Sequence, residues 1–309
     1  MSAAQNDASD ERCVRPPERP GRDFGQRNST RSQSAANAVS GRHQVRLPGT
    51  HQNGGVPLKI TDVSADAVLL LGGARAILLQ LANPAVGYGV AEHSDFVNRP
   101  LDRLRATLTY LYVIVFGTAE ETQRVAQGVA AAHSRVHSAV GAAPRYDARD
   151  ADLQLWVAAT LYDTAMHMRQ LTYGPLSESD ADALLADYAI VGVTLGVPAA
   201  LWPANRVAFA EYWRQCESEL QVDHVTRHVG QALLHPTTGP FWLRALMPTV
   251  RLVTAGLLSP ELRAAYELPH DQRRFDRLVR FLAAIYPRLP KLITHAPQRH
   301  YLRVFRAAR

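Results

Sequence analysis

The sequence predicts an all-helical fold, a single multi-helix globular domain over residues 57–309. Alanine, leucine and valine dominate the composition, and this favours helix over sheet. Apolar residues recur at helical spacing through most of this range, and no strand–turn–strand pattern competes with them. Only the Val/Ile-rich stretch 189–197 leaves room for a short strand. At 47% hydrophobic and 20% charged residues, the chain can bury a substantial core.

Residues 1–56 differ from the rest because they are polar and have no hydrophobic period, so we expect a disordered, basic and polar arm. Residues 1–30 lack the apolar segment of a secretory signal, and the longest apolar runs are too short to span a bilayer. The two cysteines, Cys13 and Cys216, are far apart and indicate no disulfide framework. These observations predict a cytoplasmic protein.

Start and stop signals divide the domain into helices. Asp62 or Ser64 can cap a helix that begins near Ala65, and Pro100 suits the first turn of another. The Thr118–Glu121 segment is a capping box, which opens a helix running through about Ser138. Further helices are predicted near 150–170, 177–194, 204–219, 221–234, 240–256, 259–266 and 271–286.

The first of these helices is unusual because Arg75 and Gln80 lie among apolar residues, with a glycine pair, Gly72 and Gly73, close before them. The glycine spacing matches neither a dinucleotide-binding loop nor a P-loop. Close packing of helices is therefore the better interpretation of the glycine pair.

The net charge of +6 comes mostly from arginine, and part of it gathers in the C-terminal region. Such a basic face could meet nucleic acid or an anionic membrane. No nucleic-acid fold signature accompanies it, and aromatic residues are not interleaved as a stacking platform. Nucleic-acid binding is not expected, whereas peripheral membrane contact stays open. The basic residues are Arg273, Arg274, Arg277, Arg280, Arg299, Arg303, Arg306 and Arg309.

Two histidines on the capping-box helix are candidates for chemistry. Four valines between residues 125 and 140 form a narrow stripe, with His133 at its edge and His137 about 40° further round. A buried imidazole needs a partner. His133 is either a core histidine bonded to a carbonyl or an axial ligand to haem iron. The spacing of the two histidines also suits a metal site, but no carboxylate or cysteine cluster completes one.

The helix from Pro100 to about 116 carries Arg103 and Thr107 on a face that continues as Tyr110 and Ile114. A solvated face would not continue in this way, so the helix should be buried on both sides. Arg103 then needs an anion or several acceptors. It either pairs with an acidic residue elsewhere or faces a cofactor pocket, whereas Arg105 should be exposed.

An ordered series of short motifs runs through most of the chain. The pieces are Gly73–Gln80, Asn83-Pro84, Glu92-His93-Ser94, Pro100, Arg103, Thr107, Phe116-Gly117, His133–Val136, Tyr146–Ala148, Leu155–Val157, Tyr173–Ser177, Leu195–Pro198 and Leu289-Pro290. In this succession, residues from about 60 to 300 resemble the MpaB/rubber-oxygenase catalytic domain family, which includes the latex-clearing proteins.

The resemblance implies an all-helical domain that encloses a pocket for b-type haem. His133 matches the family's iron-ligating histidine, with His137 as the fallback, and Arg103 and Thr107 match the distal catalytic positions. We expect His93 and Arg75 to help bind or brace the cofactor. No Cys-X-X-Cys-His motif occurs, so the haem would be held non-covalently. Characterised relatives use dioxygen to cleave carbon–carbon double bonds in isoprenoid chains.

Two positions depart from the family pattern. Ala106 replaces the lysine that precedes the distal threonine in rubber-cleaving relatives, and Ala158 replaces a histidine found in many relatives. The resemblance therefore favours a haem-dependent oxygenase of a hydrophobic, isoprenoid- or lipid-like small molecule over one that cleaves polyisoprene. The alternatives are a non-catalytic haem sensor or carrier and a cofactor-free helical interaction protein. The pattern predicts neither the substrate nor the oligomeric state.

Overall fold

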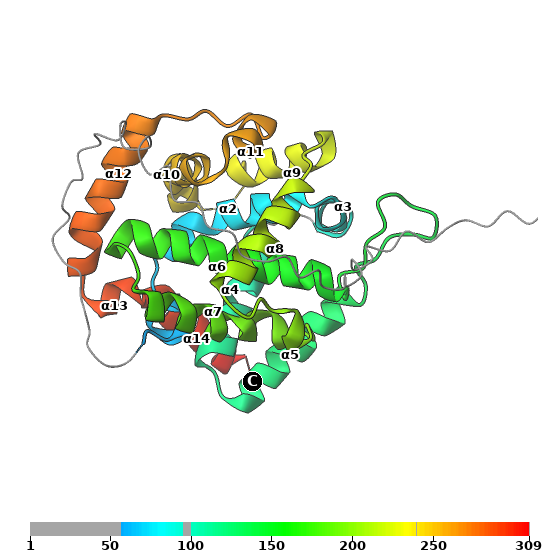
Figure 1. Cartoon of the computed structure of the whole chain (residues 1–309), viewed down its shortest axis with the longest axis horizontal. Helices are drawn as coiled ribbons and strands as arrows, with labels where there is room; N and C mark the ends of the chain where they lie inside the picture. Colours follow the sequence, from blue (N-terminus) through cyan, green and yellow to red (C-terminus); the bar gives the residue numbers. More distant parts are fainter. Residues whose placement is uncertain (1–56, 95–99, 239, 309) are drawn as a thin grey trace, which may run out of the picture. The chain divides into compact units, whose positions relative to one another are not determined.

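The computed structural model describes residues 57–94, 100–238 and 240–308, and within these ranges every regular element is a helix (Figure 1). This confirms the all-helical prediction; the arm predicted at 1–56 lies outside the described residues. The elements are α1 Ile60–Ser64, α2 Leu69–Ala82, α3 Pro84–His93, α4 Pro100–Phe116, α5 Ala119–His133, α6 Ala151–Tyr173, α7 Glu178–Val193, η1 Ala199–Leu201, α8 Arg206–Ser218, α9 His224–Leu234, α10 Phe241–Leu257, α11 Pro260–Ala265, α12 Gln272–Ile285, η2 Tyr286–Arg288, α13 Lys291–Thr294 and α14 Ala296–Ala307.

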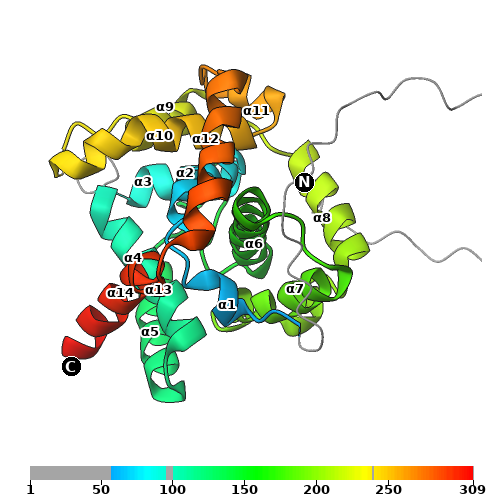
Figure 2. The same ribbon diagram turned by 90° about the vertical axis from the view of Figure 1, so that its left-hand side faces the viewer.

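Helix α2 lies at the centre of the packing, in contact with α3, α6, α9 and α10 (Figures 1 and 2). Its apolar side chains, such as those of Leu78 and Leu79, are buried almost completely. Two aromatic side chains bind its backbone from distant parts of the chain. The indole Nε1 of Trp156 donates to the carbonyl of Leu79 at 3.2 Å, and the hydroxyl of Tyr266 donates to that of Leu78 at 2.8 Å. Trp156 is therefore a core residue.

Glycine brings α2 and α6 close together at one point. A Cβ atom on Gly72 would lie 2.7 Å from the Met168 side chain and 2.8 Å from that of Thr164, so a larger residue would push the two helices apart. A Cβ on Gly73 would meet nothing within 4 Å. The packing role predicted for the glycine pair is confirmed for Gly72 alone.

Helices α4 and α5 form a packed pair joined by two residues, so the chain reverses between them. The predicted capping box is present: Glu121 N donates to Thr118 Oγ1 at 3.2 Å, and Thr118 N donates to Glu121 Oε2 at 3.0 Å. Glu121 is buried, and Arg306 of α14 binds its two carboxylate oxygens at 2.9 and 3.0 Å. This ion pair fastens the C-terminal helix to the α4–α5 pair.

The end predicted for the capping-box helix is wrong. Helix α5 ends at His133, five residues before Ser138, and the following chain turns through Gly141, whose φ is +83°. Val136 and Val140 therefore do not extend the apolar stripe, and the Val140 side chain is fully exposed. Helical spacing in the sequence continues past the point where the backbone leaves the helix.

Two smaller predictions also fail. Helix α2 begins at Leu69, after the separate short helix α1, so neither Asp62 nor Ser64 caps it. The stretch 189–197 forms no strand, because α7 continues to Val193 and a turn follows. The other predicted helices between residues 150 and 286 are present with ends within a few residues of those expected.

No single helix in the described part of the chain is long and apolar enough to cross a membrane. The adjoining helices α2 and α3 reach that length and composition together, but they meet at an angle of 105°.

Candidate functional site

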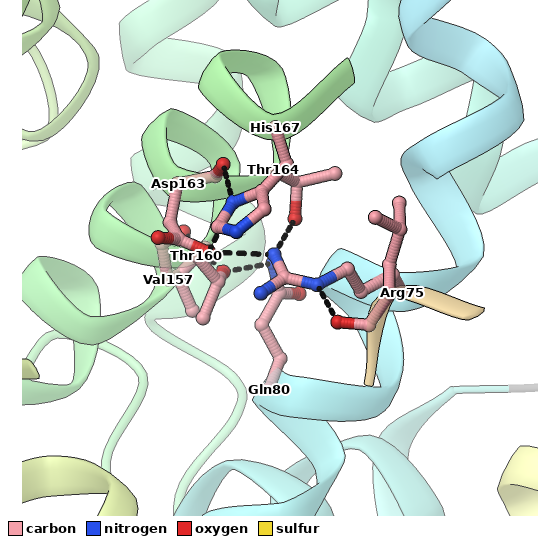
Figure 3. Close-up of polar contacts among 8 residues, drawn as sticks. Arg75, Gln80, Val157, Thr160, Asp163, Thr164 and His167 are labelled. Atoms are coloured by element: carbon pink, nitrogen blue, oxygen red, sulfur yellow. Dashed lines mark hydrogen bonds and ion pairs between the residues drawn. The ribbon is translucent and has the colours of Figure 1, made fainter. Parts of the chain in front are cut away.

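Arg75 points from α2 toward α6, into the interior (Figure 3). Its Nη1 lies 2.7 Å from Asp163 Oδ2 and donates to Thr164 Oγ1 at 2.8 Å, and its Nε donates to the carbonyl of Leu257 at 2.9 Å. The guanidinium carbon lies 5.9 Å from the centre of the Trp213 ring. This cation is bound on several sides by the protein itself.

Asp163 joins Arg75 to a histidine nearer the surface. Nδ1 of His167, one turn further along α6, lies 3.3 Å from Asp163 Oδ2 and 2.9 Å from the Asp163 carbonyl oxygen. Burial raises the pKa of the Asp163 carboxyl, but the hydrogen bond from His167 and the charge of Arg75 outweigh it, so the pKa lies below its usual value. In turn, the hydrogen bond to Asp163 raises the pKa of His167. When His167 is protonated, the three groups form a cation–anion–cation series.

A second polar contact lies one turn away in the same helix interface. Gln80 Nε2 donates to Thr160 Oγ1 at 2.9 Å, and the Thr160 hydroxyl donates to the carbonyl of Val157 at 2.7 Å. Both side chains are buried. Figure 3 shows these residues together with the Arg75 cluster; we call the whole set the α2–α6 polar seam.

The sequence analysis singled out Arg75 and Gln80 but missed their partners on α6. Thr160, Asp163, Thr164 and His167 occur at positions i, i+3, i+4 and i+7, which places them on one face of a helix. This spacing of polar residues within an apolar helix was the available signal. Arg75 is bound to residues of α6, and its role toward a cofactor stays a prediction.

His93 lies in a separate cluster at the end of α3. The hydroxyl of Tyr146 donates to Glu92 Oε2 at 2.5 Å and lies 3.0 Å from Nε2 of His93. Burial and the bond to Glu92 raise the pKa of Tyr146 to about 12, so the phenol keeps its proton at neutral pH. His93 is thus tied to the loop between α5 and α6.

His133 is the last residue of α5 and is half-buried, with its Nδ1 atom shielded from solvent. Thr107 is half-buried on α4. Arg103 belongs to the same helix, and its side chain lies outside the described residues. Helices α4 and α5 are neighbours in the chain and pack against each other, so His133 and Thr107 belong to one helix pair.

The fallback ligand His137 has a different setting. It is exposed in the loop after α5, where it forms an isolated β-bridge with Asp147. Within residues 57–94, 100–238 and 240–308, no group of three His, Cys, Asp or Glu side chains could hold a metal ion. A ligand set made only of protein side chains is therefore not found among the described residues.

The two departures from the family pattern occupy contrasting positions. Ala158 is buried where α6 packs on α7. A Cβ atom added to Gly192 of α7 would lie 3.5 Å from the Cβ atom of Ala158. The small residues allow this close approach, which leaves no room for an imidazole at position 158. Ala106, by contrast, is exposed on α4, next to Thr107. Arg105 is exposed as expected, 3.7 Å from Asp102.

Comparison with known proteins adds evidence on the family. The sequence model of the family described as ER-bound oxygenase mpaB/B'/Rubber oxygenase, catalytic domain, matches residues 61–284. An uncharacterised protein of Mycobacterium bovis and one of Mycobacterium tuberculosis are each 38% identical to this chain over 217 residues. The alignments cover 68% of this chain and 85% of each relative. No solved structure matches the chain significantly.

Proposed function

Because the chain belongs to the ER-bound oxygenase MpaB/rubber oxygenase catalytic domain family, we propose that it is a haem b-dependent oxygenase acting on a hydrophobic small molecule. Membership of an oxygenase family supports oxygenase chemistry, with dioxygen as co-substrate. The haem, its iron ligand and an isoprenoid- or lipid-like substrate are the finer parts of the proposal. The cytoplasmic location expected from the sequence stays a prediction.

The observation that carries the proposal is the setting of His133. A histidine that binds a metal through one ring nitrogen usually gives the other to the protein. Nδ1 of His133 is buried while the residue as a whole is half-exposed, so Nδ1 lies toward the protein, and the imidazole would hold the iron through its other nitrogen. A haem needs only this one protein ligand, so the lack of a larger metal cluster among the described residues does not count against it.

Haem supplies the binding and activation of dioxygen, and the chain would supply position and polarity. His133 would hold the cofactor from the end of α5. Arg103 and Thr107 belong to the helix packed against α5, where a guanidinium and a hydroxyl would donate hydrogen bonds on the substrate side. The α2–α6 polar seam would keep the central helices in place without touching the cofactor.

Ala106 narrows the proposed chemistry. A methyl group cannot donate or accept a proton, so this position supplies no acid or base, and Arg103 and Thr107 would contribute hydrogen bonds rather than proton transfer. The same observation favours a second candidate, a haem sensor or carrier without turnover. We place it second because the family match is to a catalytic domain.

Absorption spectra of the full chain, expressed with adequate haem supply, test the cofactor. We expect a Soret band and bound iron in the wild type and in His137→Ala, and loss of both in His133→Ala. His137→Ala is a matched control because it removes the same side chain four residues away, at an exposed position. Loss of the band in His137→Ala alone, or a wild type without haem, would contradict the ligand assignment.

Oxygen consumption with a panel of isoprenoid and lipid alkenes tests turnover. Arg103→Ala should keep the Soret band and lose oxygen consumption. An unchanged rate in this variant removes Arg103 from the mechanism. A wild type that binds haem but consumes no oxygen with any alkene leaves the sensor or carrier.

A further inference from the structure

Helix α12 presents two different faces. On the inner side Phe275 is buried, and Leu278 and Leu282 pack against the core cluster. Phe281 and Ile285 lie along one flank of this buried side, within about 60° of Leu278 around the helix, and are 60% and 44% exposed. In Figure 2 the helix runs down the front of the molecule to α13, so α12 lies at the surface, and the exposures of Phe281 and Ile285 show that their flank faces outward.

The exposed apolar stretch continues beyond α12. Leu289 follows η2, and Leu292 and Ile293 of α13 are 74% and 57% exposed. Single exposed apolar residues are normal, but several large ones in one short stretch mark a contact site. We call the outward side chains of Phe281, Ile285, Leu289, Leu292 and Ile293, with the basic residues among them, the C-terminal face.

Positive charge is concentrated on the same stretch. Residues 277–309 contain eight basic side chains and no acidic one, whereas the whole chain has a net charge of only +6. Arg306 is paired with Glu121, but Arg277, Arg280, Arg288 and Lys291 are exposed within or beside the apolar residues.

Asp66, which is buried, lies 3.5 Å from His295 just after α13 and is close enough to feel the charge of Lys291, and the acids of α12 itself lie near its beginning, away from its apolar end. Asp271 pairs with Arg274 at 3.1 Å, and Asp276 accepts a hydrogen bond from Gln272 at 2.7 Å. Basic charge at the apolar end of the face is thus not offset by acids of its own segment.

Basic and apolar side chains share one direction on α12. Arg277 precedes Phe281 by four residues, so the two lie one above the other on the outward side. Aromatic and aliphatic side chains with arginines beside them are the pattern of helices that lie in a membrane interface. We propose that the C-terminal face docks the protein on an anionic lipid bilayer, with the apolar side chains at the headgroup–acyl boundary and the basic ones on lipid phosphates.

Other occupants fit the face less well. A nucleic acid would take the charge but leave Phe281, Ile285 and Leu292 in water. A second copy of the chain would bring like charges together across the contact. The bilayer satisfies both the apolar and the basic side chains. This inference is independent of the oxygenase proposal, since it concerns neither haem nor turnover.

Sedimentation of the full chain with lipid vesicles tests the proposal. We expect binding to vesicles of equal parts phosphatidylglycerol and phosphatidylcholine, and little binding to phosphatidylcholine alone. The double variant F281S/I285S should bind at least about tenfold more weakly, because burial of the exposed parts of the two side chains together contributes at least about that factor. The matched control V207S/L201S removes two exposed apolar side chains on and near α8 and should bind like the wild type.

The variant F281S/I285S also distinguishes vesicle binding through the C-terminal face from vesicle binding through residues 1–56, whose arginines would bind anionic lipid by charge alone. Those arginines are unchanged in F281S/I285S, so full retention of vesicle binding in that variant overturns the proposal. R277E/R280E should weaken binding by more than about 25-fold, since each basic residue near such a surface contributes roughly fivefold. Raised salt should weaken the wild type as well.

Insertion can be read directly from fluorescence. Phe281→Trp should be quenched by brominated lipids in anionic vesicles, and the exposed control Val207→Trp should not. Failure of Phe281→Trp to be quenched overturns insertion at this face. Two other results would also overturn the proposal. One is a wild-type protein that binds no vesicles but forms a dimer, which F281S/I285S converts to a monomer. The other is nucleic-acid binding in a mobility-shift assay that is lost in R277E/R280E and kept in F281S/I285S.

Discussion

Replacing Arg75 with methionine would leave the buried Asp163 carboxylate without its closest cation. The two side chains are only 6% and 15% exposed and lie 2.7 Å apart. Removing one partner of a buried ion pair costs about 3–5 kcal/mol, because the other charge stays desolvated. His167 still faces Asp163, so we expect the lower limit of this range, about 3 kcal/mol. A loss of that size lowers the melting temperature by about 6–12 °C in a domain of this length.

The double variant distinguishes a coupled pair from two independent contacts. In R75M/D163L both charges are gone, so no charge is left buried without compensation. Replacing a whole buried pair by apolar groups is often neutral or stabilising. We therefore expect the double variant to be no less stable than either single one, which corresponds to a coupling free energy of about 3 kcal/mol.

Urea unfolding, followed by tryptophan fluorescence and far-UV circular dichroism, measures these free energies. The matched control is Arg149→Met, which breaks the exposed pair with Asp147 and should cost far less than Arg75→Met, because solvent screens this pair. If Arg75→Met costs as little as Arg149→Met, or if the double variant loses the sum of the two single losses, the ion pair does not have the role assigned to it.

Two further predictions follow from close packing and from titration. Gly256→Ala should destabilise the fold by about 1–3 kcal/mol, because the new methyl group would lie 2.3 Å from the Phe275 ring. Gly128→Ala in α5 is the control. Its methyl group meets nothing within 4 Å, and the substitution should stabilise the fold by about 0.5–1 kcal/mol. Equal effects of these two substitutions in urea unfolding would refute the packing argument. His167 stabilises the fold when protonated, since Asp163 raises its pKa above the ordinary 6.5; this contribution is complete below that value and is lost as pH rises through the raised pKa. The stability difference between wild type and His167→Gln should accordingly be largest below the ordinary pKa and shrink as the pH rises through the raised one, and a difference that does not change with pH would contradict it.

Local signals in the sequence were enough to predict most of the helices. Pro100 begins α4 as predicted, and the Thr118 capping box begins α5, because both features act within one turn of the chain. The end of α5 was missed because apolar spacing continues beyond His133. Spacing reports which residues would share a face if the helix continued, but it does not report whether the backbone continues.

The candidate site was less predictable, for a related reason. Arg75 and Gln80 stand out in the sequence, but their partners on α6 lie 80 or more residues away. No local pattern joins an arginine to one particular distant carboxylate, so the sequence left a cofactor contact open where the structure has an ion pair. Helical spacing singled out His133 and Thr107, but only the family resemblance assigned them roles at a cofactor, and those roles stay predictions.

The hydrogen bonds that Trp156 and Tyr266 donate to the backbone of α2 have a consequence for the newly made chain. Tyr266 binds the carbonyl of Leu78, which precedes it by 188 residues. At a synthesis rate of about 5–20 residues per second, the ribosome completes α2 about 10–40 s before it adds that tyrosine. Throughout this interval α2, the most apolar of the longer helices in the described part of the chain, lacks part of the structure that packs against it. Its exposed surface is what a chaperone would bind, so translation speed and chaperone supply should govern how much of this protein a cell recovers in folded form.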